Sequence, residues 1–151
     1  MYIPPGFNTI TPCLFVKNAE QFVEFLVNGL SGTEVLRSLR PDGRIANVQV
    51  RLGTSTIMAS EASDNYPPMP TACYVYVEDA DEAMARALAA GGQLEMAVDD
   101  MPYGDRQGGV KDPHGNIWWI SQRLVEAPYS AWKRSRHLFH RSPNGTAVSL
   151  R

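Results

Sequence analysis

Residues 9–29, with the sequence TITPCLFVKNAEQFVEFLVNG, decide the fold because they describe a strand that runs directly into a helix. Thr9–Val16 is mostly apolar, which favours a buried strand. Asn18 is a good N-cap residue, and Gln21 stands at the N3 position that completes a capping box. The positions after the cap recur at i, i+3, i+4 and i+7, the spacing of one helix face: Phe22, Phe25, Leu26 and Gly29.

Three further strands are predicted after this helix, and turn residues separate them. The clearest alternates apolar and polar residues, as a strand with one buried face does. Pro41-Asp42-Gly43 and Gly53-Thr54 supply the turns. The predicted strands are Thr33–Leu39, Ile45–Leu52 (the alternating one) and Thr56–Ser60.

The same order of elements returns 61 residues later, after a linker over Glu61–Pro70. Asn18 corresponds to Asp79 and Gln21 to Glu82, so the cap and its N3 partner are both repeated. The predicted second unit consists of the strand Thr71–Val77, a helix ending at Gly91-Gly92, the strand Leu94–Val98, Gly109–Lys111 before a turn, and the strand Asn116–Gln122. This duplication predicts an α+β fold of two βαβββ modules within one domain.

The composition is that of a globular protein of one domain. The chain has 151 residues, of which 44% are apolar and 20% charged, and its net charge is −2. Its longest apolar runs are far shorter than the roughly 18 residues of a membrane helix, so no membrane segment is predicted. The start, MYIPPGFN, has no signal-peptide pattern, and a cytoplasmic location is expected. Two cysteines are too few for a disulfide framework or a CxxC metal pair.

The last 25 residues differ in charge from the rest. All 16 acidic residues lie within residues 1–126, whereas residues 127–151 contain five basic residues and no acid. This segment is predicted to be a basic C-terminal extension of a domain formed by residues 1–126. Within it, Tyr129–His140 is expected to form a short helix that docks on the domain or on a second subunit. Nucleic acid is not expected as a partner, because no recognition module accompanies the charges.

Three motifs resemble the vicinal oxygen chelate superfamily, which includes glyoxalases, bleomycin-resistance proteins and extradiol dioxygenases. They are TPCLFVKNAEQFVEF at 11–25, DGRIANVQVRLGTSTIMAS at 42–60 and, as the most specific, YGDRQGGVKDPHGNIWWIS at 103–121. The nearest branch is the glyoxalase-like one that includes phosphonate-operon companion proteins. The resemblance implies two modules, at about residues 7–61 and 70–124, that form a curved eight-stranded mixed sheet around a cavity. It also implies a homodimer.

The resemblance further implies where metal-using members hold their ion. Those members place His or Gln, Glu, His and Glu on the cavity face, and the matching positions here are Thr11, Met58, Ala72 and Trp119. None of these side chains offers the imidazole nitrogen or carboxylate oxygen that zinc, nickel, manganese or iron prefers. We therefore expect no metal and no cofactor, and with them no glyoxalase I or dioxygenase activity.

The cavity face follows from period-2 alternation, extended from those four positions. It is expected to be apolar and aromatic with a few amides, as in small-molecule sites. Trp118 points to the opposite face and is expected to pack under a helix. The predicted ligand-binding residues are Trp119, Tyr74, Tyr76, Phe15, Met58, Thr11, Asn47, Gln49 and Arg106. Two alternatives stay open: these side chains fill the core, and Arg106 fixes a loop through a salt bridge.

The remaining nucleophiles and bases do not form a recognisable catalytic group. The three histidines lie outside the predicted cavity strands, so Cys13 has no histidine partner there and is expected to be a small buried residue. His114 is expected to be an exposed turn residue, and Cys73 to face away from Cys13. His137 and His140 are two nominal ligands without carboxylate neighbours, and we assign them to the solvated tail.

Two functions are compatible with these residues. In the first, the chain is a metal-independent binding protein that sequesters or carries a flat, partly apolar ligand between aromatic side chains. In the second, it is a metal-independent isomerase, cyclase or lyase that uses cavity Tyr and Arg residues. The predicted cavity face contains no Asp, Glu, Lys or His, and tyrosine is a poor base at neutral pH. These two features favour the binding function over the enzymatic one.

Overall fold

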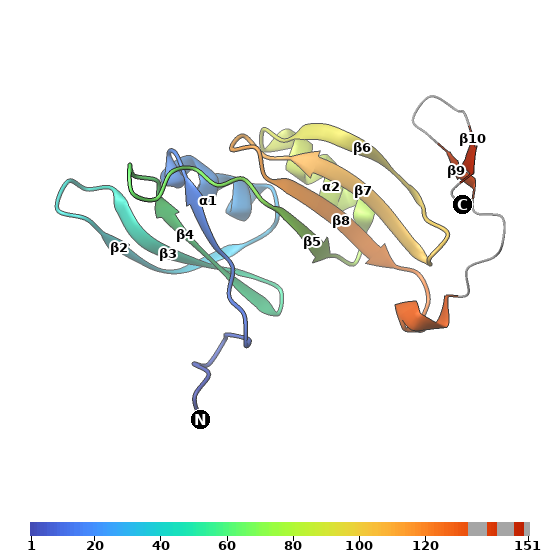
Figure 1. The fold of residues 1–151 in the computed structure, drawn as a ribbon, viewed down its shortest axis with the longest axis horizontal. Coiled ribbons are helices and arrows are strands. Elements are labelled where there is room, and N and C mark those ends of the chain that lie inside the picture. Colours follow the sequence, from blue (N-terminus) through green and yellow to red (C-terminus); the bar gives the residue numbers. More distant parts are fainter. Residues whose placement is uncertain (133–138, 142–146, 150–151) are drawn as a thin grey trace.

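Two βαβββ modules follow one another along the chain and lie side by side along the long axis of the molecule (Figure 1). The computed structural model describes residues 1–132, 139–141 and 147–149. The first module consists of β1 (Cys13–Val16), α1 (Ala19–Asn28), β2 (Thr33–Leu39), β3 (Ile45–Leu52) and β4 (Ser55–Glu61). The second consists of β5 (Ala72–Tyr76), α2 (Ala80–Ala89), β6 (Gln93–Asp100), β7 (Asp105–Lys111) and β8 (Ile117–Arg123). The predicted α+β fold of two such modules is confirmed.

Each module forms its own mixed sheet of four strands. The order is β1-β4-β3-β2 in the first sheet and β5-β8-β7-β6 in the second, with the first two strands of each order parallel. The registers of the two parallel strand pairs also correspond. Cys13 pairs with Met58 in the first module, and the residues 61 positions later, Tyr74 and Trp119, pair in the second. The eight predicted strands are therefore divided between two hydrogen-bonded sheets rather than joined in one.

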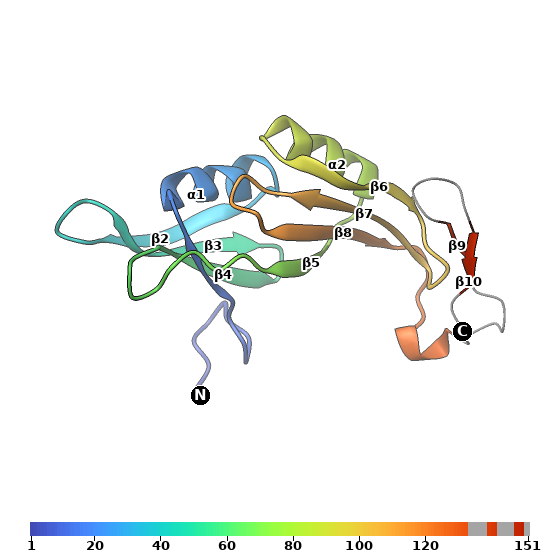
Figure 2. The same cartoon turned by 45° about the horizontal axis from the view of Figure 1, so that its top comes forward.

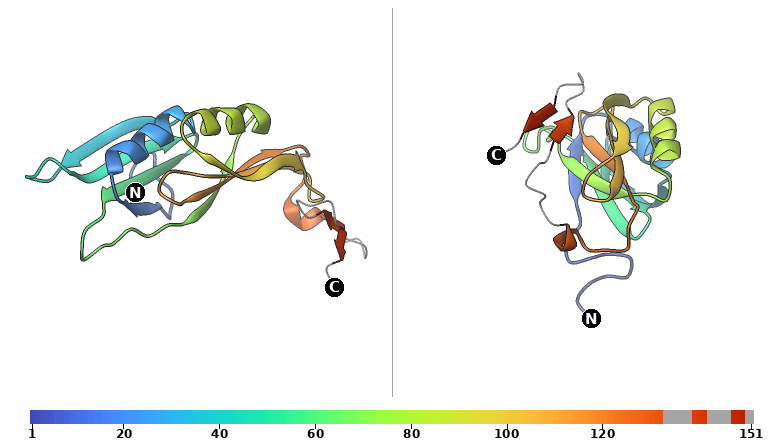
Figure 3. Two further views of the ribbon diagram at one scale, coloured as in Figure 1. Left: turned by 90° about the horizontal axis from the view of Figure 1, so that it is seen from above. Right: turned by 90° about the vertical axis from the view of Figure 1, so that its right-hand side faces the viewer.

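Both helices cover the same side of the two sheets, as Figure 2 shows. The view from above shows them next to each other over the strands (Figure 3). The hydrophobic core lies between this helix layer and the sheets, and it includes Phe22, Val48 and Trp118, each at most 1% exposed. Trp118 thus packs under a helix as predicted, and its Nε1 donates to Oδ2 of Asp112 at 2.9 Å. The side of each sheet opposite α1 and α2 is called the open face.

The two helices begin in the same way. The Asn18 side chain accepts a hydrogen bond from the backbone N–H of Gln21 at 3.3 Å, and Asp79 accepts one from Glu82 at 3.0 Å. Asn18 and Asp79 are therefore N-caps as predicted. The other half of the predicted capping box is not formed among the described residues, because the backbone N–H of Asn18 donates to Glu61 and the Glu82 side chain bonds Arg86. A second cap comes from the end of the last strand of each module: Glu61 for α1 and Gln122 for α2.

His114 joins the two modules, which corrects the expectation of an exposed turn residue. Its side chain is half-buried, with Nε2 3.2 Å from the carbonyl oxygen of Asn18 and its ring edge-on to Phe22 at 5.4 Å between centroids. The turn that carries it is held by Asp112, whose Oδ1 accepts from the backbone N–H of His114 at 2.8 Å. A turn of the second module therefore contacts the first turn of α1.

Beyond β8 the described chain contains a 3-10 turn over Tyr129–Ala131 and a small antiparallel pair, β9 (Phe139–Arg141) with β10 (Ala147–Ser149). Of the segment Tyr129–His140, where a short helix was expected, the structure describes this turn, Trp132 and the first two residues of β9, and residues 133–138 lie outside the described residues. His137 lies outside the described residues. No helix in the described part of the chain is long and apolar enough to cross a membrane.

Candidate functional site

The open face carries two hollows, one on each sheet. The first has a volume of about 550 Å³ and lies between the first sheet and the N-terminal residues of the chain. Its lining residues are Tyr2, Ile3, Pro4, Phe7, Asn8, Thr9, Thr11, Gln49 and Met58. The N-terminal arm is anchored at Gly6, whose carbonyl oxygen accepts from Nη1 of Arg51 and from Oγ1 of Thr56, each at 2.7 Å.

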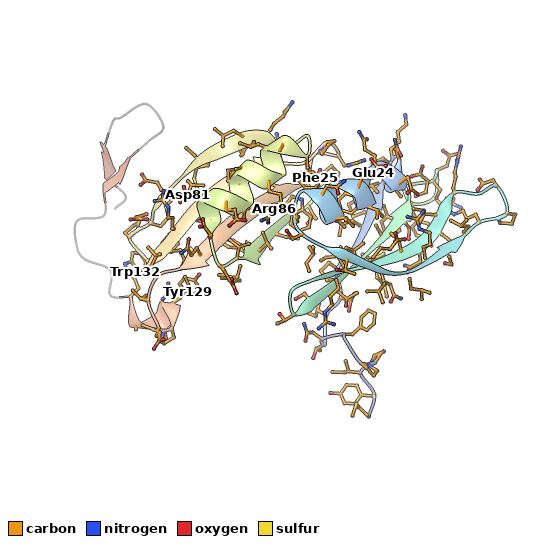
Figure 4. The ribbon with its side chains drawn as sticks, turned by 180° about the vertical axis from the view of Figure 1, so that it is seen from behind. Glu24, Phe25, Asp81, Arg86, Tyr129 and Trp132 are labelled. Carbon is orange, nitrogen blue, oxygen red and sulfur yellow. The ribbon has the colours of Figure 1, made fainter. Side chains whose placement is uncertain are left out.

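The second hollow, which we call the aromatic hollow, has a volume of about 360 Å³. It is lined only by aromatic residues: Tyr74, Tyr76, Tyr103, Tyr129 and Trp132. They come from β5, from the turn before β7 and from the segment that follows β8. Figure 4 shows Tyr129 and Trp132 at the end of the second sheet, beyond α2. Residues from the start of the predicted C-terminal extension therefore line this hollow together with residues of the second module.

Buried polar groups hold two of these tyrosines in place. Asp105 is fully buried, and its Oδ2 accepts a hydrogen bond from the Tyr129 hydroxyl, while its Oδ1 accepts from Nη1 of Arg123 at 2.8 Å. Because Tyr129 donates its proton to Asp105, the Tyr76 hydroxyl is the donor in the 3.0 Å contact between the two phenols. Burial, together with the hydrogen bond to Asp105, raises the pKa of Tyr129 well above its usual range.

A second chain of hydrogen bonds supports Tyr103. Its hydroxyl donates to Oε1 of Gln107, and Nε2 of Gln107 donates to Oγ of Ser121 at 2.6 Å. Gln107 and Ser121 are both buried beneath the open face. Burial also raises the pKa of Tyr103, so its phenol stays protonated at neutral pH. These contacts account for buried polar residues that a simple apolar core would not contain.

The rings of the aromatic hollow meet at steep angles. Tyr103 is inclined by 63° to Tyr129 and by 82° to Trp132, with ring centroids 6.2 and 6.3 Å apart. Tyr74 and Tyr76 are more nearly parallel, at 27° and 6.4 Å. The guanidinium carbon of Arg123 lies 4.4 Å from the centroid of the Tyr129 ring, which is a cation–π contact.

Five of the nine predicted ligand-binding residues line one of the two hollows. Thr11, Gln49 and Met58 line the first, and Tyr74 and Tyr76 line the second. The structure thus brings the predicted residues into two separate groups on the open face, rather than into one cavity.

The other four predicted residues lie outside both linings. Trp119 is half-buried beside Tyr74 on the open face and covers Gly109, where an added Cβ would lie 2.5 Å from Cζ3 of its indole. Asn47 is also half-buried on the open face of β3. Phe15 stacks on Tyr66 of the linker, with centroids 5.3 Å apart.

Arg106 belongs to the helix side and not to the predicted site. Its guanidinium donates to both carboxylate oxygens of Asp81 on α2, at 2.7 and 3.0 Å, and to Asp100 at 3.0 Å. Side chains alternate along β7, so Asp105 and Gln107 face the open side while Arg106 faces α2. The salt-bridge alternative is the one that the structure contains.

The two cysteines are free, and they differ in exposure. Cys13 is exposed, which corrects the expectation of a buried residue, because none of the described residues covers the open face above it. Cys73 is half-buried on the helix side, where burial raises the pKa of its thiol. Their opposite orientation agrees with the prediction.

Sequence reasoning did not assign Tyr103, Tyr129 and Trp132 to the site. Tyr129 and Trp132 were assigned to the basic extension, and Tyr103 was noted only as the first residue of the motif at 103–121. A usable signal was the clustering of Tyr and Trp directly after the last strand, at 129–132, since aromatic residues outside a regular element need a surface to pack on.

The residues at the four metal positions implied by the family resemblance do not fit a metal ion. Thr11 and Met58 offer a hydroxyl and a thioether, Ala72 has no donor, and Trp119 presents its indole to Gly109. In the described ranges, no group of three or more His, Cys, Asp and Glu side chains is placed to hold a metal ion.

Comparison with known proteins gives one family. Residues 6–120 match the model of the Glyoxalase family, described as the Glyoxalase/Bleomycin resistance protein/Dioxygenase superfamily. A protein of Mycobacterium bovis is 30% identical over 131 residues, which cover 78% of this chain and 84% of that protein. A protein of Mycobacterium tuberculosis (strain H37Rv) is also 30% identical over 131 residues, with 78% and 75% covered.

Solved structures share the fold at lower identity. TioX from Micromonospora sp. ML1 is 24% identical with a TM-score of 0.67, covering 78% of this chain and 99% of TioX. TnmS3, an antibiotic binding protein from Streptomyces sp. CB03234, is 21% identical with a TM-score of 0.63, covering 82% and 98%. A glyoxalase-related enzyme from Fulvimarina pelagi is 20% identical with a TM-score of 0.63, covering 93% and 96%.

Proposed function

The chain belongs to the Glyoxalase/Bleomycin resistance protein/Dioxygenase superfamily, and from this premise we propose that it binds a small molecule without a metal ion. It sequesters or carries a flat, partly apolar ligand on the open face. The observation that carries this proposal is the aromatic hollow, an open depression of about 360 Å³ that five aromatic side chains line. Such a lining, with few polar groups, is typical of sites for small organic molecules.

TnmS3, which shares the fold, is an antibiotic binding protein, so the fold is compatible with the proposed binding. The side chains at the four metal positions support a metal-independent mode. Trp119, beside Tyr74 on the same face, extends the aromatic surface on which a flat ligand can stack. Residues 1–126 form the binding domain, and the first residues of the extension complete its site.

The alternative, a metal-independent isomerase, cyclase or lyase, needs a group that can accept or donate a proton at the site. The carboxylate at the aromatic hollow is Asp105, which is already engaged by Arg123 and Tyr129. The raised pKa values of Tyr103 and Tyr129 keep both phenols protonated at neutral pH and make them weaker acids, so neither is suited to proton transfer there. The site residues therefore favour binding over this second function.

Binding of flat compounds by the purified protein tests the proposal. A set of flat polycyclic compounds is screened by thermal shift, and compounds that raise Tm are titrated by calorimetry. Replacing Trp132 or Trp119 with Ala is expected to weaken binding by about tenfold, which corresponds to about 1.4 kcal/mol. Elemental analysis is expected to find no stoichiometric transition metal.

The control is Trp118→Ala, which removes a core side chain on the helix side and is expected to lower Tm while the remaining folded protein binds normally. The proposal fails if no compound binds. It also fails if both open-face variants bind like the wild type.

A further inference from the structure

The aromatic hollow has the shape of a box rather than a slot. Tyr103 stands nearly perpendicular to Trp132, at 82°, and steeply to Tyr129, at 63°. A flat molecule can stack on only one of two perpendicular rings. A compact, roughly spherical group can instead touch several rings at once, so the geometry favours such a group.

The electrostatics of the hollow favour a positive charge. Each aromatic ring carries negative potential on its face. No Lys, Arg or His side chain is among the described residues that line the hollow. One of the rings already contacts a cation, since Arg123 lies 4.4 Å over Tyr129. The charge of Arg123 is matched by Asp105 at 2.8 Å, so this pair adds no net positive charge.

The box is also held in place before any ligand arrives. Tyr129 is fixed by the buried carboxylate of Asp105, and Tyr103 by the buried amide of Gln107. A phenol that donates a hydrogen bond to a carboxylate gains electron density on its ring, which strengthens attraction to a cation. Rings that are held in place lose little conformational entropy on binding.

We propose that the aromatic hollow binds the alkylated ammonium group of a small organic cation. The inference rests on the proposed function and adds the chemical class of the ligand. The methylated ammonium head sits in the aromatic hollow, where it contacts Tyr74 as well as Tyr103, Tyr129 and Trp132, and the flat body lies along Trp119. Aromatic rings around a quaternary ammonium group are a recognised way to bind such a charge without a salt bridge.

Two probes of the same shape separate charge from apolar contact. Choline and 3,3-dimethylbutan-1-ol differ in having nitrogen or carbon at the branched centre, so only choline is charged. Each is titrated calorimetrically into the full-length protein at millimolar concentration. Choline is expected to bind about tenfold more tightly than the alcohol. Equal affinities, or no binding of choline, would overturn the inference.

Three variants test whether choline binds at the rings of the aromatic hollow. Tyr74 is a suitable position, because it is 58% exposed and its hydroxyl makes no hydrogen bond within the described residues. Tyr74→Phe keeps the ring and is expected to bind choline within about twofold of the wild type, whereas Tyr74→Leu keeps only apolar surface and is expected to lose about fivefold or more. Tyr66→Leu, at a linker position that is 60% exposed, is the matched control and is expected to change nothing.

The outcomes also separate this inference from the proposed function. If flat neutral compounds bind while choline does not, the protein is a small-molecule binder and the ammonium inference is wrong. If neither choline nor any flat compound binds, both are wrong. Choline binding that survives Tyr74→Leu unchanged places the cation elsewhere and overturns the inference.

Discussion

Gly108 and Gly109 explain why the sequence pattern did not predict strand β7. Gly108 and Gly109 lie in the middle of β7, where glycine is unfavourable, and the pattern indicated Gly109–Lys111 only as residues before a turn. The structure gives the reason for both glycines. A Cβ on Gly108 would lie 2.7 Å from Met84 of α2, and one on Gly109 would lie 2.5 Å from Trp119. Because neither glycine has a side chain, Met84 can pack against one face of the strand and Trp119 against the other.

The alternation of side chains along a strand predicted which face of the sheet each residue lies on. It did not predict which other parts of the chain cover that face. It placed Trp118 and Trp119 on opposite faces, and the structure agrees. A buried Cys13 was also predicted, and this residue is exposed because no described element lies above β1. Burial depends on parts of the chain that are distant in sequence, and alternation carries no information about them.

The two cysteines allow a direct test of these different environments. Burial, and to a lesser extent the charge of Asp112, raises the pKa of Cys73, so at a given pH below that pKa a smaller fraction of it is the reactive thiolate. Labelling with a thiol reagent near pH 8 is expected to be biphasic, with exposed Cys13 fast and Cys73 slow. The slow rate should keep rising with pH above 9, as the Cys73 thiol ionises. Cys13→Ser is expected to remove the fast phase, and a fast phase that persists in this variant contradicts the assignment.

At the scale of elements, both helices are capped twice, and only one of the two caps was visible in the sequence. The first is local: Asn18 and Asp79 lie next to the helix that each one caps. The second comes from the end of the last strand in each module. Glu61 accepts from the backbone N–H of Ala19 at 2.9 Å, and Gln122 accepts from that of Ala80 at 3.0 Å. Local caps follow from spacing, whereas these contacts span 42 residues and require the fold.

The cap from Glu61 is expected to stabilise the first module measurably. Glu61→Ala leaves the N–H groups of Asn18 and Ala19 without this acceptor, and it removes a negative charge from the positive end of the α1 dipole. We expect the free energy of unfolding to fall by about 1 kcal/mol, measured by denaturant titration. Glu61→Gln, which copies the second module, should lose less than Glu61→Ala.

The matched control is Glu24→Ala, at an exposed position of α1 (Figure 4). It removes the same type of side chain at a position on the helix itself and is expected to change stability by no more than about 0.5 kcal/mol. If Glu61→Ala and Glu24→Ala have the same effect, then Glu61 does not cap the helix.

At the scale of the whole molecule, the duplicated units predicted the fold, but not which residues line the aromatic hollow. The repeat of caps and strands is a property of each module and can be read along the chain. The aromatic hollow instead combines β5 with the turn at Tyr103 and with Tyr129 and Trp132, which lie outside both modules. A search for repeats leaves such residues out of the domain, although here they line a hollow on its surface.

The open face leads to a prediction about assembly. Val35, Leu36 and Leu39 of β2 and Tyr74 and Tyr76 of β5 each expose more than half of their surface. Exposed apolar area of this kind is unfavourable in water and commonly marks an interface. The outer strands β2 and β6 also have no partner on their outer side among the described residues. Pairing of two chains would cover both features, so we expect a homodimer in solution.

Light scattering coupled to gel filtration at micromolar concentration is therefore expected to give about twice the chain mass of 16.7 kDa. Leu36→Glu places a charge on the exposed apolar surface of β2, where burial in an interface would be costly, so this variant is expected to shift the mass toward the monomer. Leu88→Glu, on the exposed side of α2 in the helix layer, is the control and should leave the mass unchanged. A wild-type mass near that of one chain would contradict the dimer. In that case the hollows of the open face would have to bind ligand within a single chain, with the aromatic side chains of β5 exposed until the ligand covers them.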